Sequence, residues 1–386
     1  MNYNYIKYGI DNFLENKSKY KNYIFGIVAN QCSITNDLKY SHFEIIKDFN
    51  LKYLFSPQHG FYATEQANMI ETKNSIDDFS ELPIISLYSN TRKINVEYLE
   101  KIDCLIFDLQ DVGARYYTYL WTLYYCMESC EKLNKKLIVL DRPNMINGND
   151  IEGIKLKSEF TSFVGLYSIF NRFGLTIGEF ANMLKQEKFR NLDLEIIKLS
   201  NWDRKKYFDE YKNFFINPSP NLPNMESIIT YPGTCLFEGT NISEGRGTTR
   251  PFEYIGAPFI KSIDLINEIN KYTLKGFYLR PVSFKPTFDK WENEVCNGFF
   301  IHITNRKLFQ PLRTTIIILK SIKKLYPEEF KWFEGAYEYE NKNLAIDILF
   351  GSDFLRNNID NDISVIFEML EKEESMKKES EKYFLY

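Results

Sequence analysis

Side chains capable of acid–base chemistry gather first in the stretch FSPQHGFYATEQ, residues 55–66, where an apolar run ends. It holds Gln58, Glu65 and His59, and His59 is one of only three histidines in the chain. A histidine can carry or accept a proton near neutral pH, which would suit an active site. A plain turn that ends a strand, shaped by its proline and glycine, is the alternative interpretation.

A second cluster lies in DLQDVGARYYTY, residues 108–119, with Asp111, Arg115 and Tyr117 close together in sequence. Carboxylates and a guanidinium beside a strand end are costly to bury unless they are paired or used. They fit either a structural ion pair or a binding site, because the planar fork of Arg115 matches the two oxygens of a substrate carboxylate. Tyr117 lies close enough to the strand end to face a cleft.

The densest cluster is EGTNISEGRGTT, residues 238–249, which packs two glutamates, Asn241, Arg246 and three glycines into twelve residues. Glycine allows backbone N–H groups to approach a ligand closely, and Glu244 and Arg246 could serve as acid/base and as anchor. A solvated glycine-rich surface loop is the alternative. Neither the dinucleotide fingerprint nor the phosphate loop of nucleotide-binding proteins is present.

The elements that must position these clusters follow from alternating apolar and amphipathic stretches, which are typical of βαβ units with a parallel sheet. Strands are predicted over residues 23–30, 51–57, 82–89, 104–110, 136–143 and in the segment 194–202. Helices are predicted over residues 41–49, 95–101, 118–134 and 176–188, the last beginning with a capping box of Thr176 and Glu179. The fold class is therefore α/β, with a doubly wound, mostly parallel sheet in residues 1–200.

In such sheets ligands bind beyond the carboxyl ends of the strands. The second predicted strand ends at Gln58 and His59, the fourth near Asp111, and the fifth at Asp141 and Arg142. These polar groups are therefore expected at one edge of the sheet.

A second, smaller α+β domain is predicted over residues 201–386, including the loop 238–249. Its first part, residues 216–259, is rich in turn-forming residues and contains Asn221. Loops of this length are usually functional or disordered, and the many aromatic and apolar residues argue against disorder. Helices are expected over residues 262–272, 311–325 and 363–378, and strands over 282–285 and 298–303.

Composition excludes several classes of protein. The net charge is −4, from 48 basic and 52 acidic residues, so the charge balance favours neither nucleic acid nor an anionic membrane as partner. The six cysteines are scattered and lack the spacing of a metal site, so we expect reduced core thiols and no metal. The first residues contain no uninterrupted apolar stretch typical of a signal peptide and no long apolar window follows, so we expect a cytoplasmic protein. His42 is expected to be solvent-facing or packed on a helix, and His302 to be structural in a strand.

Taken in order, the motifs resemble the bacterial exo-β-N-acetylmuramidase family over nearly the whole chain. The similarity rests on GIVANQ, FSPQHGF, LPIISLY, FDLQDVGARYYTY, VLDRPN, LTIGEFA, SPNLP, YPGTCLFEGTNISEGRGTTRPFE and FKPTFDK. It implies a Rossmann-like domain that binds no dinucleotide, a smaller second domain and no cofactor. It also implies a cleft between the domains that removes N-acetylmuramic acid from the non-reducing end of peptidoglycan fragments.

The chain departs from this family at two motifs. In many members the second strand ends in Pro-Glu-His-Gly, and the resemblance implies that this glutamate is the catalytic acid/base. Here Gln58 takes its place, and a neutral amide cannot perform that proton transfer. The family's Arg-His-Gly before the LTIGEFA helix reads Arg172-Phe173-Gly174 in this chain.

Glycosidases generally need two carboxyl groups, one a protonated acid and the other a base or nucleophile. Glu65, Glu238, Asp111 and Glu244 are available, and we expect Glu244 or Asp111 to supply the acid/base function. Gln58 and His59 would hold the sugar or polarise a water molecule, and Arg115 or Arg246 would bind the lactyl carboxylate of muramic acid. The further residues expected to bind substrate are Tyr117, Asn241, Asp141, Arg142, Glu65 and Asn221.

Two other classes of protein remain open at this point. Gln58 favours a catalytically impaired protein that binds muramyl sugars on the same scaffold. A nucleotide-dependent oxidoreductase would follow from the architecture alone, but fold does not imply function and the phosphate loop is missing.

Overall fold

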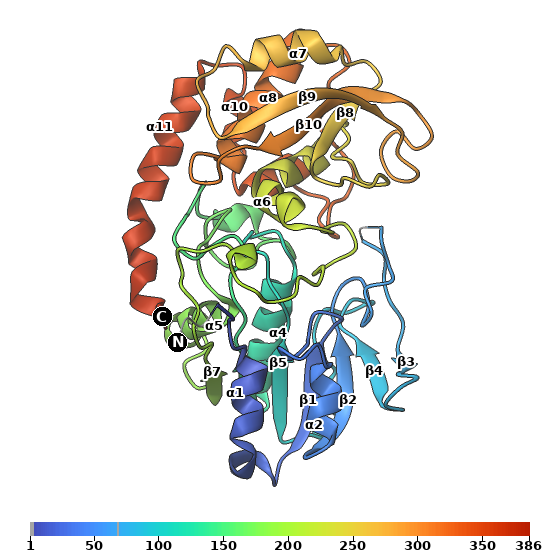
Figure 1. Ribbon diagram of the computed structural model, residues 1–386, viewed down its shortest axis with the longest axis vertical. Coiled ribbons are helices and arrows are strands. Elements are labelled where there is room, and N and C mark those ends of the chain that lie inside the picture. The colour runs from blue at the N-terminus through green and yellow to red at the C-terminus, as the bar shows by residue number, and fades with distance from the viewer. Residues whose placement is uncertain (1–3, 68) are drawn as a thin grey trace.

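Two β-sheets organise the chain in the computed structural model, which describes residues 4–67 and 69–386 (Figure 1). The larger sheet has seven strands in the order β3-β4-β2-β1-β5-β6-β7, and every neighbouring pair is parallel except β3 with β4. The strands are β1 (Ile24–Ala29), β2 (Asn50–Ser56), β3 (Ser75–Ile76), β4 (Pro83–Ser86), β5 (Cys104–Asp108), β6 (Lys136–Leu140) and β7 (Leu194–Ile197). The predicted α/β fold with a doubly wound sheet is confirmed.

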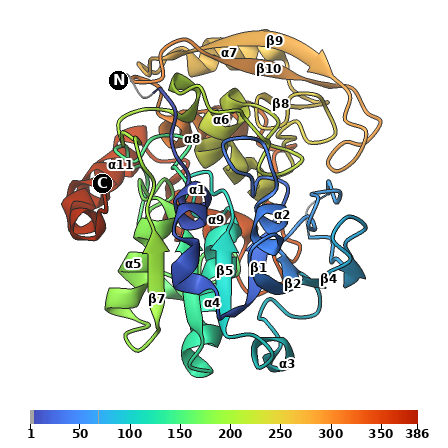
Figure 2. The same cartoon turned by 60° about the horizontal axis from the view of Figure 1, so that its bottom comes forward.

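Helices cover both faces of this sheet, which is why the central strand β5 is buried along its whole length (Figure 2). Helices α1 (Gly9–Glu15) and α2 (Ser41–Ile46) pack on one face, and α4 (Tyr119–Lys132) and α5 (Ile177–Glu187) on the other. The short helix α3 (Val96–Leu99) precedes β5. The capping box at the start of α5 is confirmed, because the side chains of Thr176 and Glu179 each accept the other's backbone N–H.

The smaller sheet is antiparallel, in the order β8-β10-β9, and lies above the larger sheet in Figure 1. Its strands are β8 (Tyr254–Ala257), β9 (Phe277–Phe284) and β10 (Cys296–Ile303). Helix α7 (Ser262–Ile269) packs on β9 and β10 and on α8 (Pro311–Leu325), which in turn contacts α6 (Met225–Thr234). The predicted second α+β unit is thus present, while its boundary between residues 200 and 201 stays a prediction.

Several elements of this part were not predicted. The segment 216–259, expected to be a turn-rich loop, contains α6 and β8, because Asn224 caps the helix and β10 pairs with the strand. Strand β9 begins five residues before the predicted start at 282, because it pairs with β10 along its full length. The helices α9 (Ala345–Phe350) and α10 (Phe354–Asn358) are short and lack a long apolar periodicity.

The end of the chain returns from the smaller sheet to the larger one. Helix α11 (Ile363–Glu374) and the 3₁₀ helix Ser375–Tyr383 run down the side of the molecule towards α5 (Figure 1). The Tyr386 hydroxyl donates to Asp141 Oδ2 at 2.7 Å, and the Leu385 N–H donates to Glu179 Oε1 at 2.9 Å. The two halves of the chain are therefore joined at this end as well as at the linker between them.

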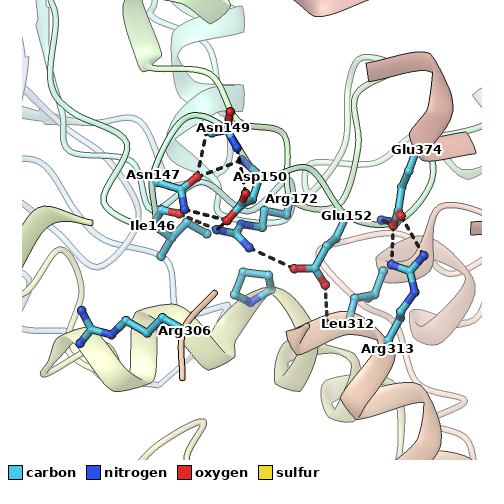
Figure 3. Close-up of polar contacts among 12 residues, drawn as sticks. Ile146, Asn147, Asn149, Asp150, Glu152, Arg172, Arg306, Leu312, Arg313 and Glu374 are labelled. Atoms are coloured by element: carbon cyan, nitrogen blue, oxygen red, sulfur yellow. Dashed lines mark hydrogen bonds and ion pairs between the residues drawn. The ribbon is translucent and has the colours of Figure 1, made fainter. Parts of the chain in front are cut away.

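A second junction between the halves is an ion-pair cluster at the start of α8 (Figure 3). Arg172 donates to Glu152 Oε1 at 3.1 Å, and Glu152 Oε2 accepts the N–H of Leu312 at 3.2 Å. Nearby, Arg313 forms a two-pronged pair with Glu374 of α11, at 2.9 and 2.8 Å. Arg172 thus orients the Glu152 carboxylate, which makes the contact with α8 across the junction.

His42 and the six cysteines lie in packed positions, whereas His302 in β10 is only half-buried. His42 is fully buried, with Nε2 3.9 Å from Asp77 Oδ2, and burial lowers the pKa of His42 to about 4. All six cysteines are buried and free. Within residues 4–67 and 69–386, no helix combines the length and the apolar character that a membrane span requires.

Candidate active site

Two adjoining cavities lie where the loop after β2 meets residues of the second half of the chain. The outer cavity has a volume of about 550 Å³, and the inner one, of about 30 Å³, has room for little more than a water molecule. Glu238, Arg246 and Tyr337 line both cavities and so form the wall between them. The inner cavity is lined in addition by Gln58, His59, Tyr117, Asn221 and Glu338, and the outer one by Asn241, Glu244, Phe288, Asp289, Lys290, Trp291 and Phe333.

Gln58 is held in the inner cavity by partners on both sides of its amide. Thr118 Oγ1 donates to its Oε1 at 2.7 Å. Its Nε2 donates to the Tyr88 hydroxyl at 3.2 Å and to Glu338 Oε1 at 3.4 Å. The amide nitrogen therefore faces a carboxyl group that comes from the other half of the chain.

His59 is neutral, and its tautomer is set by its neighbour. Its Nδ1 lies 2.7 Å from the carbonyl oxygen of Glu65, which can only accept, so Nδ1 carries the proton. Burial lowers the pKa of His59 to about 4, which leaves Nε2 unprotonated as an acceptor at neutral pH. The backbone of His59 has a positive φ of 72°, an uncommon conformation for a residue other than glycine.

Glu338 is a site residue that the sequence did not indicate. It occupies a two-residue turn closed by backbone hydrogen bonds of 2.8 and 2.9 Å between Tyr337 and Glu340. The Tyr88 hydroxyl donates to Glu338 Oε2 at 2.8 Å, and only 3% of the residue is exposed. Burial raises the pKa of Glu338 to about 7, so its carboxyl group can hold a proton near neutral pH.

Glu238 is buried in the wall between the cavities, and it favours the ionised form, whereas Glu338 can hold a proton. Arg246 Nη2 donates to its Oε1 at 2.7 Å, and the Tyr337 hydroxyl donates to its Oε2 at 2.6 Å. Burial favours the neutral acid, but the charge of Arg246 and these hydrogen bonds outweigh it and lower the pKa of Glu238. The site thus combines one carboxyl group that can be protonated with one that is ionised.

Glu244 is bound by two cations in the outer cavity. Its Oε1 lies 3.2 Å from Arg246 Nε, and its Oε2 accepts from Lys290 Nζ at 2.8 Å. Burial raises the pKa of Glu244, and the positive charge of Lys290, which lowers it, does not offset this effect. Both oxygens of Glu244 are therefore already engaged.

Gly247 in the loop 238–249 allows this loop to pack closely on the segment between β9 and β10. Gly247 has a φ of 75°, and a Cβ there would lie 2.7 Å from the carbonyl oxygen of Phe288. Its own carbonyl accepts the N–H of Thr287 at 2.9 Å. This close approach places Phe288 and the following residues, through Trp291, against the outer cavity.

Of the side chains predicted from sequence, seven line these cavities. They are Gln58, His59, Tyr117, Asn221, Asn241, Glu244 and Arg246. Asn221 donates to the carbonyl of Gln66 at 2.7 Å, while its Oδ1 is buried and lacks a hydrogen-bond partner among the described residues. An acceptor left in this way inside a cavity suits a water molecule or a ligand hydroxyl.

Five others lie elsewhere, although they are close to the same sheet edge. Arg115 is fully buried and donates to the carbonyls of Ile154, Ile169 and Leu349 at 2.8–3.0 Å, so the structure gives it a structural role and not that of a substrate anchor. Arg142 pairs with Asp108 at 2.6 Å. The side chain of Glu65 lines neither of the two cavities, and only its backbone contacts His59.

Asp111 and Asp141 are buried acids that also lie outside both cavities. Asp141 accepts from Thr176 Oγ1 at 2.8 Å and the Gly178 N–H at 2.7 Å, in addition to Tyr386, and so anchors α5. Asp111 Oδ1 accepts the Gly113 N–H at 2.7 Å, while Oδ2 has no hydrogen-bond partner in the part of the chain that the structure describes. Burial raises the pKa of both groups to about 7.

The described residues contain no group of three or more histidine, cysteine, aspartate or glutamate side chains placed to hold a metal ion. The side chains that line the two cavities include carboxyl groups, a neutral imidazole, amides and cations.

Comparisons with known proteins agree over the whole length of the chain. The models of the N-terminal and C-terminal parts of "Exo-beta-N-acetylmuramidase NamZ" match residues 25–226 and 229–386. A relative from Bacillus subtilis, described as "Peptidoglycan beta-N-acetylmuramidase NamZ", is 40% identical, with 99% of this chain and 91% of the relative covered. Two crystal structures of DUF1343 family proteins from Bacteroides fragilis superpose with TM-scores of 0.88 and 0.74, at 28% and 27% identity, over 99% of each chain.

Proposed function

The chain belongs to the exo-β-N-acetylmuramidase NamZ family, and on that premise we propose that it removes N-acetylmuramic acid from the non-reducing end of peptidoglycan fragments. It is a glycosidase, like its Bacillus subtilis relative. The observation that carries the proposal is a cavity of sugar size lined by the buried Glu238, beside a small inner cavity lined by Glu338, a buried carboxyl group with the opposite protonation preference.

The outer cavity supports a carbohydrate ligand. Its volume of about 550 Å³ lies within the usual range for small-molecule sites. Phe288, Trp291 and Phe333 offer apolar surfaces for the faces of a sugar ring, and Asn241 and Lys290 offer polar groups at the same cavity. Most of these side chains come from the second half of the chain, whereas Gln58 and His59 reach the inner cavity from the first.

The pair of carboxyl groups supports hydrolysis of a glycosidic bond. Such enzymes place a protonated acid and an ionised carboxylate on either side of the scissile bond. Two acids whose environments push their pKa values in opposite directions are the usual source of this division of roles. Glu338 and Glu238 meet that description, because the pKa of Glu338 is raised and the pKa of Glu238 is lowered.

Although residue 58 is a glutamine, the site still contains a carboxyl group that can act as an acid, that of Glu338. The family resemblance implies a glutamate at this position, but the Glu338 carboxyl group lies 3.4 Å from the Gln58 amide. Nothing in this geometry favours the alternative of an impaired sugar-binding protein. His59 and Asn221 remain proposed contacts to the sugar or to a water molecule in the inner cavity.

Arg246 remains the proposed partner of the lactyl carboxylate, because it lines both cavities while Arg115 lines neither. Arg246 contacts two carboxylates already, and Lys290 supplies a second cation in the outer cavity. We also propose a cytoplasmic role in recycling of cell-wall fragments; the six free, buried cysteines support a reducing compartment.

The test is release of free sugar from a chromogenic β-glycoside of N-acetylmuramic acid and from the disaccharide MurNAc-GlcNAc, with the chain as it is and with Gln58→Glu. We expect turnover by the unmodified chain and little turnover of the matching N-acetylglucosamine glycoside, which lacks the lactyl group. Turnover that appears only after Gln58→Glu would instead support the sugar-binding alternative.

A further inference from the structure

A carboxyl group from the second half of the chain lies beside the Gln58 amide, at the end of the second strand of the larger sheet. Gln58 and Glu338 are 280 residues apart in sequence, yet the Gln58 amide donates to Glu338 Oε1. Both side chains line the inner cavity, and Tyr337, the residue before Glu338, lines the inner and the outer cavity. Glu338 therefore lies next to Tyr337, one of the residues that separate the inner cavity from the outer one.

The hydrogen-bond partners of Glu338 distinguish it from the other acids of the site. Its two side-chain partners, the Tyr88 hydroxyl and the Gln58 amide, are both neutral. Glu238 is paired with Arg246, and Glu244 is paired with Arg246 and Lys290. A carboxyl group with neutral partners can gain and lose a proton without breaking an ion pair, as a general acid must.

The backbone conformation at Glu338 is a second feature that is typical of a functional site. Glu338 and Tyr339 have φ values of 47° and 66°, so the turn between Tyr337 and Glu340 requires positive φ at both central residues. Such turns strongly prefer Asn-Gly or Gly-Gly at these positions. Non-glycine residues held in this conformation cost stability and cluster at functional sites.

From this arrangement we infer that Glu338 is the catalytic acid of the site, the group that protonates the leaving oxygen of the substrate. The inference rests on the proposed glycosidase function. Gln58 becomes a positioning residue, because Thr118 holds its Oε1 while its Nε2 holds the carboxyl group of Glu338.

The proposed step is an ordinary hydrolysis and needs no further reactant. The bond between the anomeric carbon and the glycosidic oxygen breaks, its electron pair stays on that oxygen, and the oxygen takes the proton of Glu338. Water adds to the anomeric carbon, its proton goes to an ionised carboxylate, and exchange with solvent returns a proton to Glu338. Glu238, ionised beside Arg246, faces the positive charge that develops on the sugar.

The pH dependence follows from the groups around Glu338. Burial and the charge of Glu238 raise the pKa of Glu338, and the Tyr88 and Gln58 hydrogen bonds and the charge of Arg92 lower it, to give a pKa of about 7. An acid must be protonated to act, so turnover is expected to fall as the pH rises through about 7.

The experiment compares Glu338→Gln with the unmodified chain on two substrates that differ in leaving group. On MurNAc-GlcNAc, whose leaving sugar needs a proton, we expect kcat to fall by about 100-fold or more. On the 2,4-dinitrophenyl glycoside, whose leaving group needs none, kcat should fall much less, and the loss of activity at alkaline pH should disappear. Glu334→Gln, an exposed acid four residues earlier, is the control and should behave like the unmodified chain.

A second variant keeps the test valid if Glu338→Gln does not fold. Tyr88→Phe removes a hydrogen bond that stabilises the ionised form of Glu338, so the alkaline limb of the kcat profile should move to higher pH. An unchanged alkaline limb in Tyr88→Phe would overturn the inference, as would the same fold-loss of kcat on both substrates in a folded Glu338→Gln. If the unmodified chain releases no sugar from either substrate, the proposed function itself is wrong and this inference falls with it.

Discussion

At the scale of single residues, the immediate partners of each carboxyl group decide whether it is charged. Glu238 contacts a guanidinium and is ionised, Glu338 contacts neutral groups and can be protonated, and Asp111 is buried with one oxygen lacking a partner among the described residues. All three are nearly inaccessible to solvent, so burial alone does not separate them. Their division of roles comes from what each oxygen contacts.

Asp111→Asn should stabilise the fold at alkaline pH. The pKa of Asp111 is raised from about 4 in the unfolded chain to about 7 in the fold, so the folded state binds more protons between these values and the free energy of unfolding falls as the pH rises through them. Removing the charge should raise the free energy of unfolding at pH 8 by up to about 4 kcal/mol, and change it little at pH 4.

Urea titrations at pH 4 and pH 8 measure this difference. Asp37→Asn, at an exposed aspartate, is the matched control and should shift stability by no more than about 0.5 kcal/mol. An equal effect of Asp111→Asn at both pH values would show that its hydrogen bond to Gly113, and not its charge, matters to stability.

At the scale of elements, the loop 238–249 shapes the outer cavity through its contact with the segment between β9 and β10. Gly247→Ala places a Cβ at positive φ and 2.7 Å from the carbonyl oxygen of Phe288. Because that contact is with backbone, the two segments must separate, and we expect a loss of about 1–3 kcal/mol in stability. KM should rise more than kcat falls, since Phe288 lines the outer cavity while Glu338 lines the inner one.

Thermal unfolding and steady-state kinetics on the disaccharide test this expectation. The control is Thr249→Ala, an exposed position in the same loop. A Gly247→Ala protein with unchanged KM would mean that the outer cavity does not bind the sugar.

At the scale of the whole molecule, the cavities depend on how the two halves of the chain are held together. Arg172 and Glu152 are both nearly buried, and Glu152 also accepts the N–H of Leu312 at the start of α8 (Figure 3). Arg172→Met leaves Glu152 as a buried charge without its guanidinium partner, which typically costs about 3–5 kcal/mol. Arg190→Met, at an exposed arginine on the first half, should cost far less.

Unfolding followed by two probes, one for each half, is the measurement. If the junction couples the halves, Arg172→Met should lower the midpoint for both probes, because each half loses its support from the other. A midpoint that falls for one probe alone would show that the halves unfold independently and that the cluster stabilises only its own side.

Local pattern alone determined most of the larger sheet. The strands β1, β5 and β6 and the helices α5 and α8 were predicted to within a few residues, because their apolar periodicity and caps are properties of contiguous sequence. Helix α6, strand β8 and the early start of β9 were missed, because they depend on a cap or on pairing with partners distant in the chain. The motifs also sufficed to identify the family.

Some residues of the site could likewise be predicted from local sequence, and others are recognised only in the tertiary structure. Sequence placed Gln58, His59, Glu244 and Arg246 among the candidates, because they follow a strand end or crowd a glycine-rich loop. Asp141 and Arg115 had the same local signature, yet their oxygens and nitrogens are used by α5 and by backbone carbonyls. Glu338, 280 residues from Gln58, could be joined to the site only by the tertiary structure, since no local pattern records which distant side chain will share a cavity.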